Sequence, residues 1–131
     1  MNQRLCSLFL VALPYAAGCG APGGSLRATI KQYESGNVNA ASRECWDVSQ
    51  DAEYLSDKAH TRYLVYCGLT HYRLGRRGEG QRLLVQGNME YLDGKSSWLK
   101  PAIVDELYKA LDDLEGRPHM RPTRESFRKR R

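Results

Sequence analysis

The sequence predicts an all-α fold of about five antiparallel helices between residues 25 and 116, with disordered termini. Apolar residues recur at helical spacing, most clearly at Leu99, Ile103, Leu107, Leu111 and Leu114. Glycine-containing breaks at Gly36, Gly75 and Gly94 divide the helical stretches. The chain that follows position 18 is long enough for one domain with one modest core, but not for a second domain.

Residues 1–18 resemble an export signal, because Arg4 gives a positive start and Leu5 to Leu13 form an apolar run too short to span a bilayer. The run ends in Ala16-Ala17-Gly18-Cys19, which resembles a bacterial lipobox. That resemblance implies that Cys19 becomes the mature N-terminus and carries a diacylglycerol and an N-acyl chain. Ala16 stands where leucine is commonest, so ordinary cleavage and a soluble periplasmic adaptor or sensor is the alternative.

Residues 19–24 follow as the lipidated cysteine and a flexible tether, Gly20-Ala21-Pro22-Gly23-Gly24. Gly20 is not an aspartate, and in enterobacteria-like sorting this implies the outer membrane. We therefore expect a lipid-anchored protein of the bacterial cell envelope that faces the periplasm.

The first helical hairpin is predicted from Ser25, a good N-cap residue, with Leu26, Ile30 and Tyr33 at helical spacing. The first helix stops at residues 35–37, and a second runs over about residues 38–48. The polar residues 49–56 then connect this hairpin to the next one.

The second hairpin is the clearest part of the pattern. Its first helix begins after Ser56 and continues to Leu74, and its second runs from about residue 78 to 89 or 91. Apolar residues crowd the stretch after residue 62 too densely for a one-sided surface helix, so this helix must be covered on more than one face. Gly68 and Gly80 each cost roughly 1 kcal/mol inside a helix, which is understandable if they let two backbones approach closely.

This stretch resembles a tetratricopeptide repeat (TPR). The positions that carry the resemblance are Leu64, Gly68, Leu74-Gly75, Gly80 and Leu84. His71 replaces the usual tyrosine, and no proline closes the unit. Setting Gly36 on Gly75 aligns Tyr33 with Tyr72 and indicates an internal repeat whose period is somewhat longer than the usual unit of about 34 positions. Chance similarity between two glycine turns is the alternative.

A last amphipathic helix follows Trp98, tolerates Pro101 in its first turn and covers the exposed end of the hairpins. Residues 117–131 are expected to be disordered. They carry +6 and Arg4 carries +1 of the chain's total of +5, so residues 19–116 carry about −2. The basic tail Arg128, Lys129, Arg130 and Arg131 could contact anionic lipid headgroups or an acidic partner. A basic nucleic-acid-binding fold is not indicated.

Cys45 and Cys67 lie on consecutive helices and could form a disulfide in an oxidising compartment, or remain two buried thiols. Together with His60 and His71 they could also ligate zinc, although the spacing matches no known ligand pair. A metal or redox protein is thus a further alternative. There is no phosphate-binding loop and no nucleophile elbow. We expect no catalytic residue, metal, cofactor or small-molecule substrate.

The TPR resemblance implies that the first helix of each hairpin lines a concave face that binds another protein. The groove residues that follow from it are Tyr33, Arg62, Leu69, Tyr72 and Arg73. Tyrosine and arginine anchor interfaces well, so the groove would prefer an acidic or C-terminal segment. Burial in the core is the alternative for several of them. The implied function is a scaffold or assembly factor for a secretion, pilus or outer-membrane machine, without enzymatic activity.

Overall fold

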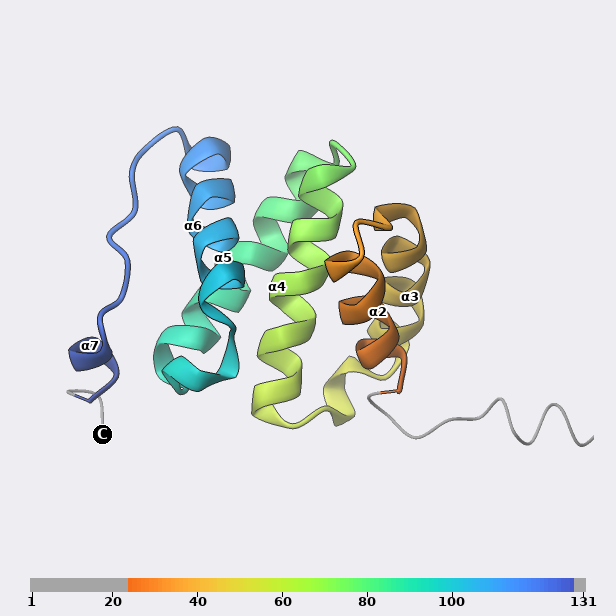
Figure 1. Cartoon of the computed structure of the whole chain (residues 1–131), viewed down its shortest axis with the longest axis horizontal. Helices are drawn as coiled ribbons and strands as arrows, with labels where there is room; N and C mark the ends of the chain where they lie inside the picture. Colours follow the sequence, from red (N-terminus) through yellow and green to blue (C-terminus); the bar gives the residue numbers. More distant parts are fainter. Residues whose placement is uncertain (1–23, 129–131) are drawn as a thin grey trace, which may run out of the picture.

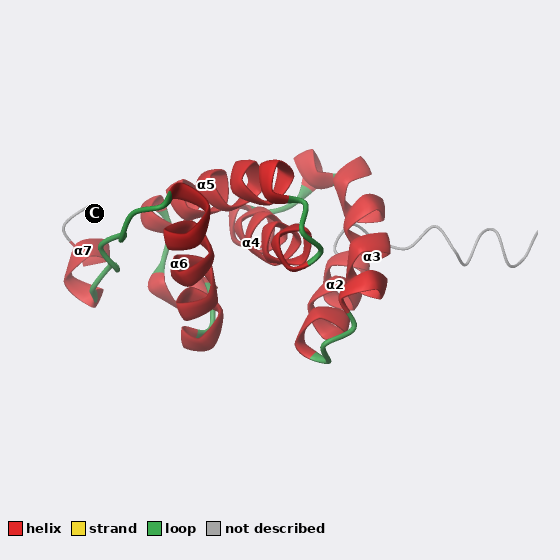
Figure 2. Cartoon of the chain, turned by 90° about the horizontal axis from the view of Figure 1, so that it is seen from above, coloured by secondary structure: helices red, strands yellow, loops and turns green. Residues whose placement is uncertain are grey.

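The computed structural model describes residues 24–128, and this part of the chain is all-α without strands. The helices are α2 (Gly24–Glu34), α3 (Val38–Gln50), α4 (Asp57–Arg73), α5 (Arg77–Asp93), α6 (Pro101–Glu115) and α7 (Arg124–Arg128), with 3-10 turns η1 (Ala52–Tyr54) and η2 (Ser96–Trp98). They stand side by side in an arc around α4 (Figures 1 and 2). The expected signal peptide, Cys19 and residues 129–131 lie outside the described residues.

The two hairpins, α2–α3 and α4–α5, turn in the same way. Gly36 and Gly75 have φ values of +80° and +77°, which a residue with a side chain rarely adopts. The Asn37 amide donates to the carbonyl of Gln32 at 2.8 Å, and at the matching place in the second hairpin the Arg76 amide donates to that of His71 at 2.9 Å. Both turns thus close with the same backbone hydrogen bond, which supports the register of the internal repeat.

Glycines hold α4 and α5 together at close range. A Cβ atom on Gly68 would lie 2.7 Å from Leu84 Cγ, and one on Gly80 would lie 3.0 Å from the backbone nitrogen of Tyr72. Gly87, which no sequence pattern singled out, has the same role, since its Cβ would lie 2.9 Å from Val65 Cγ2. Larger residues at these positions would force the two helices apart.

Helix α4 is the centre of the domain and contacts α2, α3, α5 and α6. All its residues from Tyr63 to Thr70 are buried, because neighbours cover it on several sides. The larger apolar cluster joins α4 to α5 and α6 and also includes Tyr33, Ala41 and Phe127. The smaller one joins α4 to α2 and α3 and also includes Leu83 of α5. Within residues 24–128, no helix combines the length and the apolar character needed to cross a bilayer.

The chain beyond α6 corrects one expectation. α6 ends at Gly116, which has a φ of +65°, and Pro118 and Pro122 then disfavour a further long helix. Residues 117–128, here called the strap, run back beside α6 to α7 (Figure 1). Phe127 is only 6% exposed and packs on Tyr91 with ring centroids 5.0 Å apart. We expected disorder here, but the burial of one aromatic side chain stabilises by roughly 2 to 3 kcal/mol and fixes the described part of the tail.

Candidate peptide-binding groove

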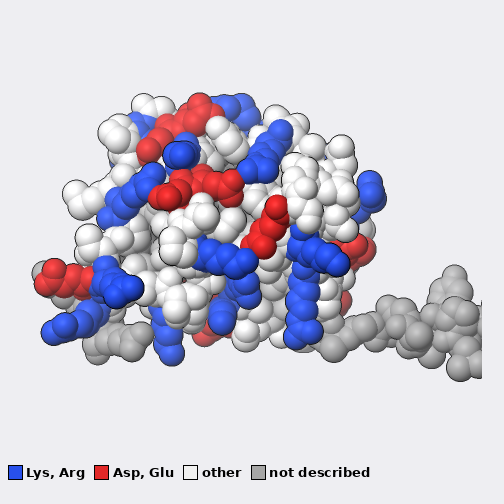
Figure 3. Space-filling model, in the orientation of Figure 1, with Lys and Arg blue, Asp and Glu red and all other residues white. Residues whose placement is uncertain are grey.

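A groove of about 800 Å³ lies between the first half of α4, the start of α6 and the strap. Apolar side chains line part of it, among them Tyr91, Trp98, Leu99, Pro101, Val104 and Pro122. The charged side chains around it are Lys58, Arg62, Lys100, Arg121 and Arg124, with Asp105 as the single carboxylate. On the face drawn in Figure 3, basic side chains occur in both the upper and the lower half, with acidic side chains between them. The lining of the groove is therefore cationic, although residues 19–116 together carry about −2.

The first turns of α4 and α6 place the basic residues of two walls of the groove. Ser56 Oγ accepts a hydrogen bond from the Ala59 amide at 3.3 Å, so α4 begins at Asp57. Lys58 and Arg62 then lie one helical turn apart on the same face of α4. Pro101 occupies the first turn of α6, which leaves Lys100 in extended backbone at the helix start.

The cations of the groove are only partly neutralised. Lys100 Nζ lies 2.7 Å from Glu34 Oε1, and Arg121 forms an ion pair with Asp105. Lys58 and Arg124 have no carboxylate partner within residues 24–128. In the same part of the chain, Arg62 Nε is buried without a hydrogen-bond acceptor. A buried donor without a partner costs about 1 to 3 kcal/mol.

Glu34 lies outside this groove, in the neighbouring pocket between α2 and α6, and binds the Lys100 side chain from that side. It accepts hydrogen bonds from Lys100 and, at 2.8 Å, from the Tyr66 hydroxyl. The hydrogen bond from Lys100 lowers the pKa of Glu34, with a smaller contribution from Tyr66 and against the effect of burial. Burial, followed by Glu34, raises the pKa of Tyr66, so this hydroxyl remains a donor. The three side chains form a polar bridge from α2 to α6 across α4.

Two expected groove residues are core residues instead, contrary to the expectation from the sequence. Tyr33 is 3% exposed and Leu69 is 2% exposed, because α6 packs across α4 on this side. The Tyr33 hydroxyl donates to Glu106 at 3.2 Å. Arg73 lies over the Tyr33 ring, 4.5 Å from its centroid, and its Nη2 is 2.5 Å from Glu106. Tyr33 and Leu69 therefore have almost no surface to offer a partner.

The other three expected residues are not brought together. Tyr72 is partly exposed and donates to Asp113 at 2.7 Å. Arg62 lies in the basic groove, whereas Arg73 lines a separate pocket of about 310 Å³ between α2 and α6. The length of helix that separates these two arginines corresponds to roughly 16 Å. Of the basic tail, Arg128 is exposed at the end of α7, and Lys129, Arg130 and Arg131 lie outside the described residues.

The cysteine pair is bonded and lies away from the groove. Cys45 and Cys67 form a disulfide with a Cα–Cα distance of 5.7 Å. The bond removes both thiols as metal ligands. His60 instead pairs with Glu90 at 2.8 Å. In the described part of the chain, no group of three or more His, Cys, Asp or Glu side chains is arranged to hold a metal ion.

Sequence reasoning missed most of the groove. Lys58, Lys100, Arg121 and Arg124 come from three segments that are distant in the chain, and we found no signal in the sequence that joins them. Scans against protein-family models, curated proteins and solved structures each found no match for this chain. Its function is therefore inferred from its own residues.

Proposed function

We propose that this protein is a non-enzymatic scaffold of the bacterial cell envelope, anchored by lipid on Cys19, that holds another envelope protein by an acidic segment. The basic groove takes that segment, either through its side-chain carboxylates or through a C-terminal carboxylate. A scaffold or assembly factor for a secretion, pilus or outer-membrane machine is the corresponding role.

The observation that carries the proposal is the combination of charge and apolar surface in the groove. Five basic side chains line it against one carboxylate, and two of them, Lys58 and Arg124, have no carboxylate partner within residues 24–128. Arginine binds carboxylates with a fixed pair of donors, and lysine adds a mobile point charge. Trp98, which is partly exposed, and the exposed Pro101 provide the apolar contact that a peptide needs beyond charge.

The architecture supports a binding role of the TPR type. The second hairpin repeats the turn of the first, and α6 continues the arc beyond them (Figure 2). Stacked helical hairpins create extended concave surfaces, which proteins of this build use to hold partners. The lipobox-like residues before Cys19 would place this surface in the periplasm.

The proposal can be tested with a rhodamine-labelled peptide of four glutamates with a free C-terminus, titrated with the full chain in detergent. A Lys58→Glu/Arg62→Glu variant should bind it at least about tenfold more weakly, because like charges now face each other. The charge-matched control is Arg27→Glu/Lys31→Glu on the exposed face of α2, which should bind as the unchanged protein does.

Melting curves of both variants separate loss of binding from loss of folding. Since Arg62 is partly buried, Lys58→Glu alone serves as a milder second variant. Equal affinity of the groove variants and the control would contradict the proposal. An amidated peptide distinguishes recognition of the C-terminal carboxylate from recognition of acidic side chains.

A further inference from the structure

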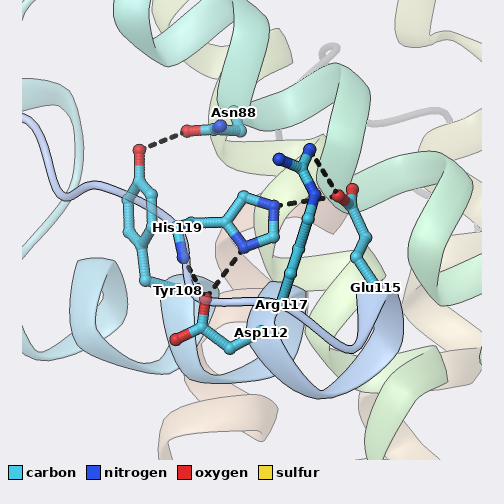
Figure 4. A network of polar contacts seen from close by, with 6 residues as sticks. All are labelled: Asn88, Tyr108, Asp112, Glu115, Arg117 and His119. Atoms are coloured by element: carbon cyan, nitrogen blue, oxygen red, sulfur yellow. Dashed lines mark hydrogen bonds and ion pairs between the residues drawn. The ribbon is translucent and has the colours of Figure 1, made fainter.

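His119 fastens the strap to α6 through both nitrogens of its ring (Figure 4). Nδ1 lies 2.8 Å from Asp112 Oδ1, and Nε2 lies 2.9 Å from Glu115 Oε2. The backbone amide of His119 also donates to Asp112 Oδ1 at 2.7 Å. Carboxylates only accept hydrogen bonds, and only the imidazolium form of histidine has a donor on each nitrogen. The geometry therefore selects the charged ring, which is 14% exposed.

The groups around this ring set its protonation. α6 contributes the carboxylates of Asp112 and Glu115, and the strap contributes Arg117, whose Nη2 is 3.2 Å from Glu115. The strap also contributes Arg121, which acts on Asp112. α5 presents the uncharged Asn88, which accepts a hydrogen bond from Tyr108 at 2.6 Å. Burial raises the pKa of Tyr108 to about 12, so this phenol stays neutral.

The balance of these groups favours the imidazolium. The hydrogen bond to Asp112 is the largest influence and raises the pKa of His119, and Glu115 adds to it. Burial and the Arg117 charge oppose the shift without cancelling it. Histidine ordinarily titrates near pH 6.5, so the bridging ring gives up its proton above that pH.

The strap matters to the groove because it forms one of its walls. Arg121, Pro122 and Arg124 line the groove from the strap, and they follow His119 closely in the chain. Apart from His119, the strap is held by the ion pairs of Arg117 with Glu115 and of Arg121 with Asp105, and by the packing of Phe127 on Tyr91. Without the His119 contact, the end of the strap nearest to α6 keeps only the exposed ion pair between Arg117 and Glu115, which contributes little.

We propose that His119 is a proton-operated latch that closes the strap on the basic groove, so that the affinity for an acidic segment falls when His119 is deprotonated. The neutral ring has one N–H group, and its other nitrogen turns a lone pair toward a carboxylate oxygen. That contact changes from attraction to repulsion. Arg121 and Arg124 then no longer stay beside Lys58 and Arg62. This proposal rests on the proposed binding of an acidic segment at the groove.

The direction with pH follows from the raised pKa. The His119 imidazolium stabilises the closed strap, and the closed strap in turn raises the pKa of His119. This stabilisation is complete below about pH 6.5, the ordinary pKa of histidine, and it is lost as the pH rises through the higher pKa that His119 has in the folded protein. Of the ordinary side chains, histidine is the type that titrates between about pH 5.5 and 8.5. A change in affinity across this interval therefore reports a group such as His119.

The experiment combines two readouts on the full chain in detergent. The first is the affinity for the rhodamine-labelled tetraglutamate peptide from about pH 5.5 to 8.5. The second is nitrogen-15 NMR of the His119 ring and backbone amide, which reports the protonation of the ring and the protection of the amide without any peptide. Two variants accompany the unchanged protein, His119→Asn and the control His60→Asn. His60 also faces a carboxylate, Glu90, but it lies outside the strap.

We expect the affinity of the unchanged protein and of His60→Asn to fall by about threefold or more as the pH rises. His119→Asn should bind weakly at all pH values, as the unchanged protein does at the alkaline end of the range. The amide of His119 should lose protection as its ring deprotonates. Affinity that is constant with pH, or a pH dependence that survives in His119→Asn, would overturn the latch.

Absence of peptide binding at every pH would instead overturn the proposed function. In that case the NMR titration still decides about the latch. The latch would be refuted if the His119 ring titrates at or below about pH 6.5. It would also be refuted if the hydrogen-exchange protection of the His119 amide stays constant while the ring deprotonates.

Discussion

Replacing Gly68 with leucine is the sharpest test of how α4 and α5 pack. Gly68 lies in the middle of α4, and its missing side chain leaves room for Leu84 from α5. Even a single Cβ atom would lie 2.7 Å from both Cγ and Cδ2 of Leu84 and 3.1 Å from its backbone nitrogen. Leu84 is fully buried and cannot swing away, so the two helices must separate.

Overpacking of this kind costs typically about 1 to 3 kcal/mol, and the further carbon atoms beyond Cβ place leucine at the upper end. Removing a glycine from a helix interior returns up to about 1 kcal/mol of helix propensity. We therefore expect a net loss of about 2 kcal/mol in the free energy of unfolding. For a domain of this size, that lowers the melting temperature by roughly 8 °C or more.

The control is Gly78→Leu, in the first turn of α5, where a Cβ atom would meet no other atom within 4 Å. Melting curves followed by circular dichroism should show a marked loss for Gly68→Leu, and no loss or a small gain for Gly78→Leu, where only the helix propensity changes. Equal melting temperatures would refute the close approach of the two helices at Gly68.

Three further predictions concern other parts of the chain. Reduction of the Cys45–Cys67 disulfide, whose cysteines are separated by 22 positions in the sequence, should lower the free energy of unfolding by about 3 kcal/mol in the chain-entropy account, as measured by urea titration with and without reductant. Cys19→Ser should abolish incorporation of labelled palmitate and release the protein from the membrane fraction, and unchanged fractionation would contradict lipid anchoring. Lys100→Met should raise the pKa of Glu34 toward its ordinary value, so that Glu34 becomes protonated at higher pH than in the unchanged protein, which carbon-13 NMR of the carboxyl group would detect.

The sequence predicts where helices and turns occur, because both depend on residues that are close to one another in the chain. The start of α4 after Ser56, the turns at Gly36 and Gly75 and the close approach at Gly68 and Gly80 all follow from local preferences of these residue types. The sequence leaves Cys45 and Cys67 open as a disulfide, as two buried thiols or as zinc ligands, because the pairing depends on a Cα–Cα distance that only packing decides.

Which side chains remain accessible was not determined locally. Tyr33 and Leu69 fit a binding surface in the sequence, yet α6 returns across α4 and buries them. Phe127 stands alone in a basic run, and its partner Tyr91 belongs to α5, far earlier in the chain. A periodic pattern shows that a helix has an apolar face, but the element that covers this face can come from anywhere in the chain.

The sequence by itself therefore determined the helices, their turns and the charge of the tail, since spacing, capping and composition act over a few residues. The tertiary structure alone decided that Lys58 and Arg62 share a groove with Lys100, Arg121 and Arg124, and that His119 bridges two carboxylates of α6. Electrostatic and packing interactions act through space, and the distances that govern them arise only when segments far apart in the chain pack together.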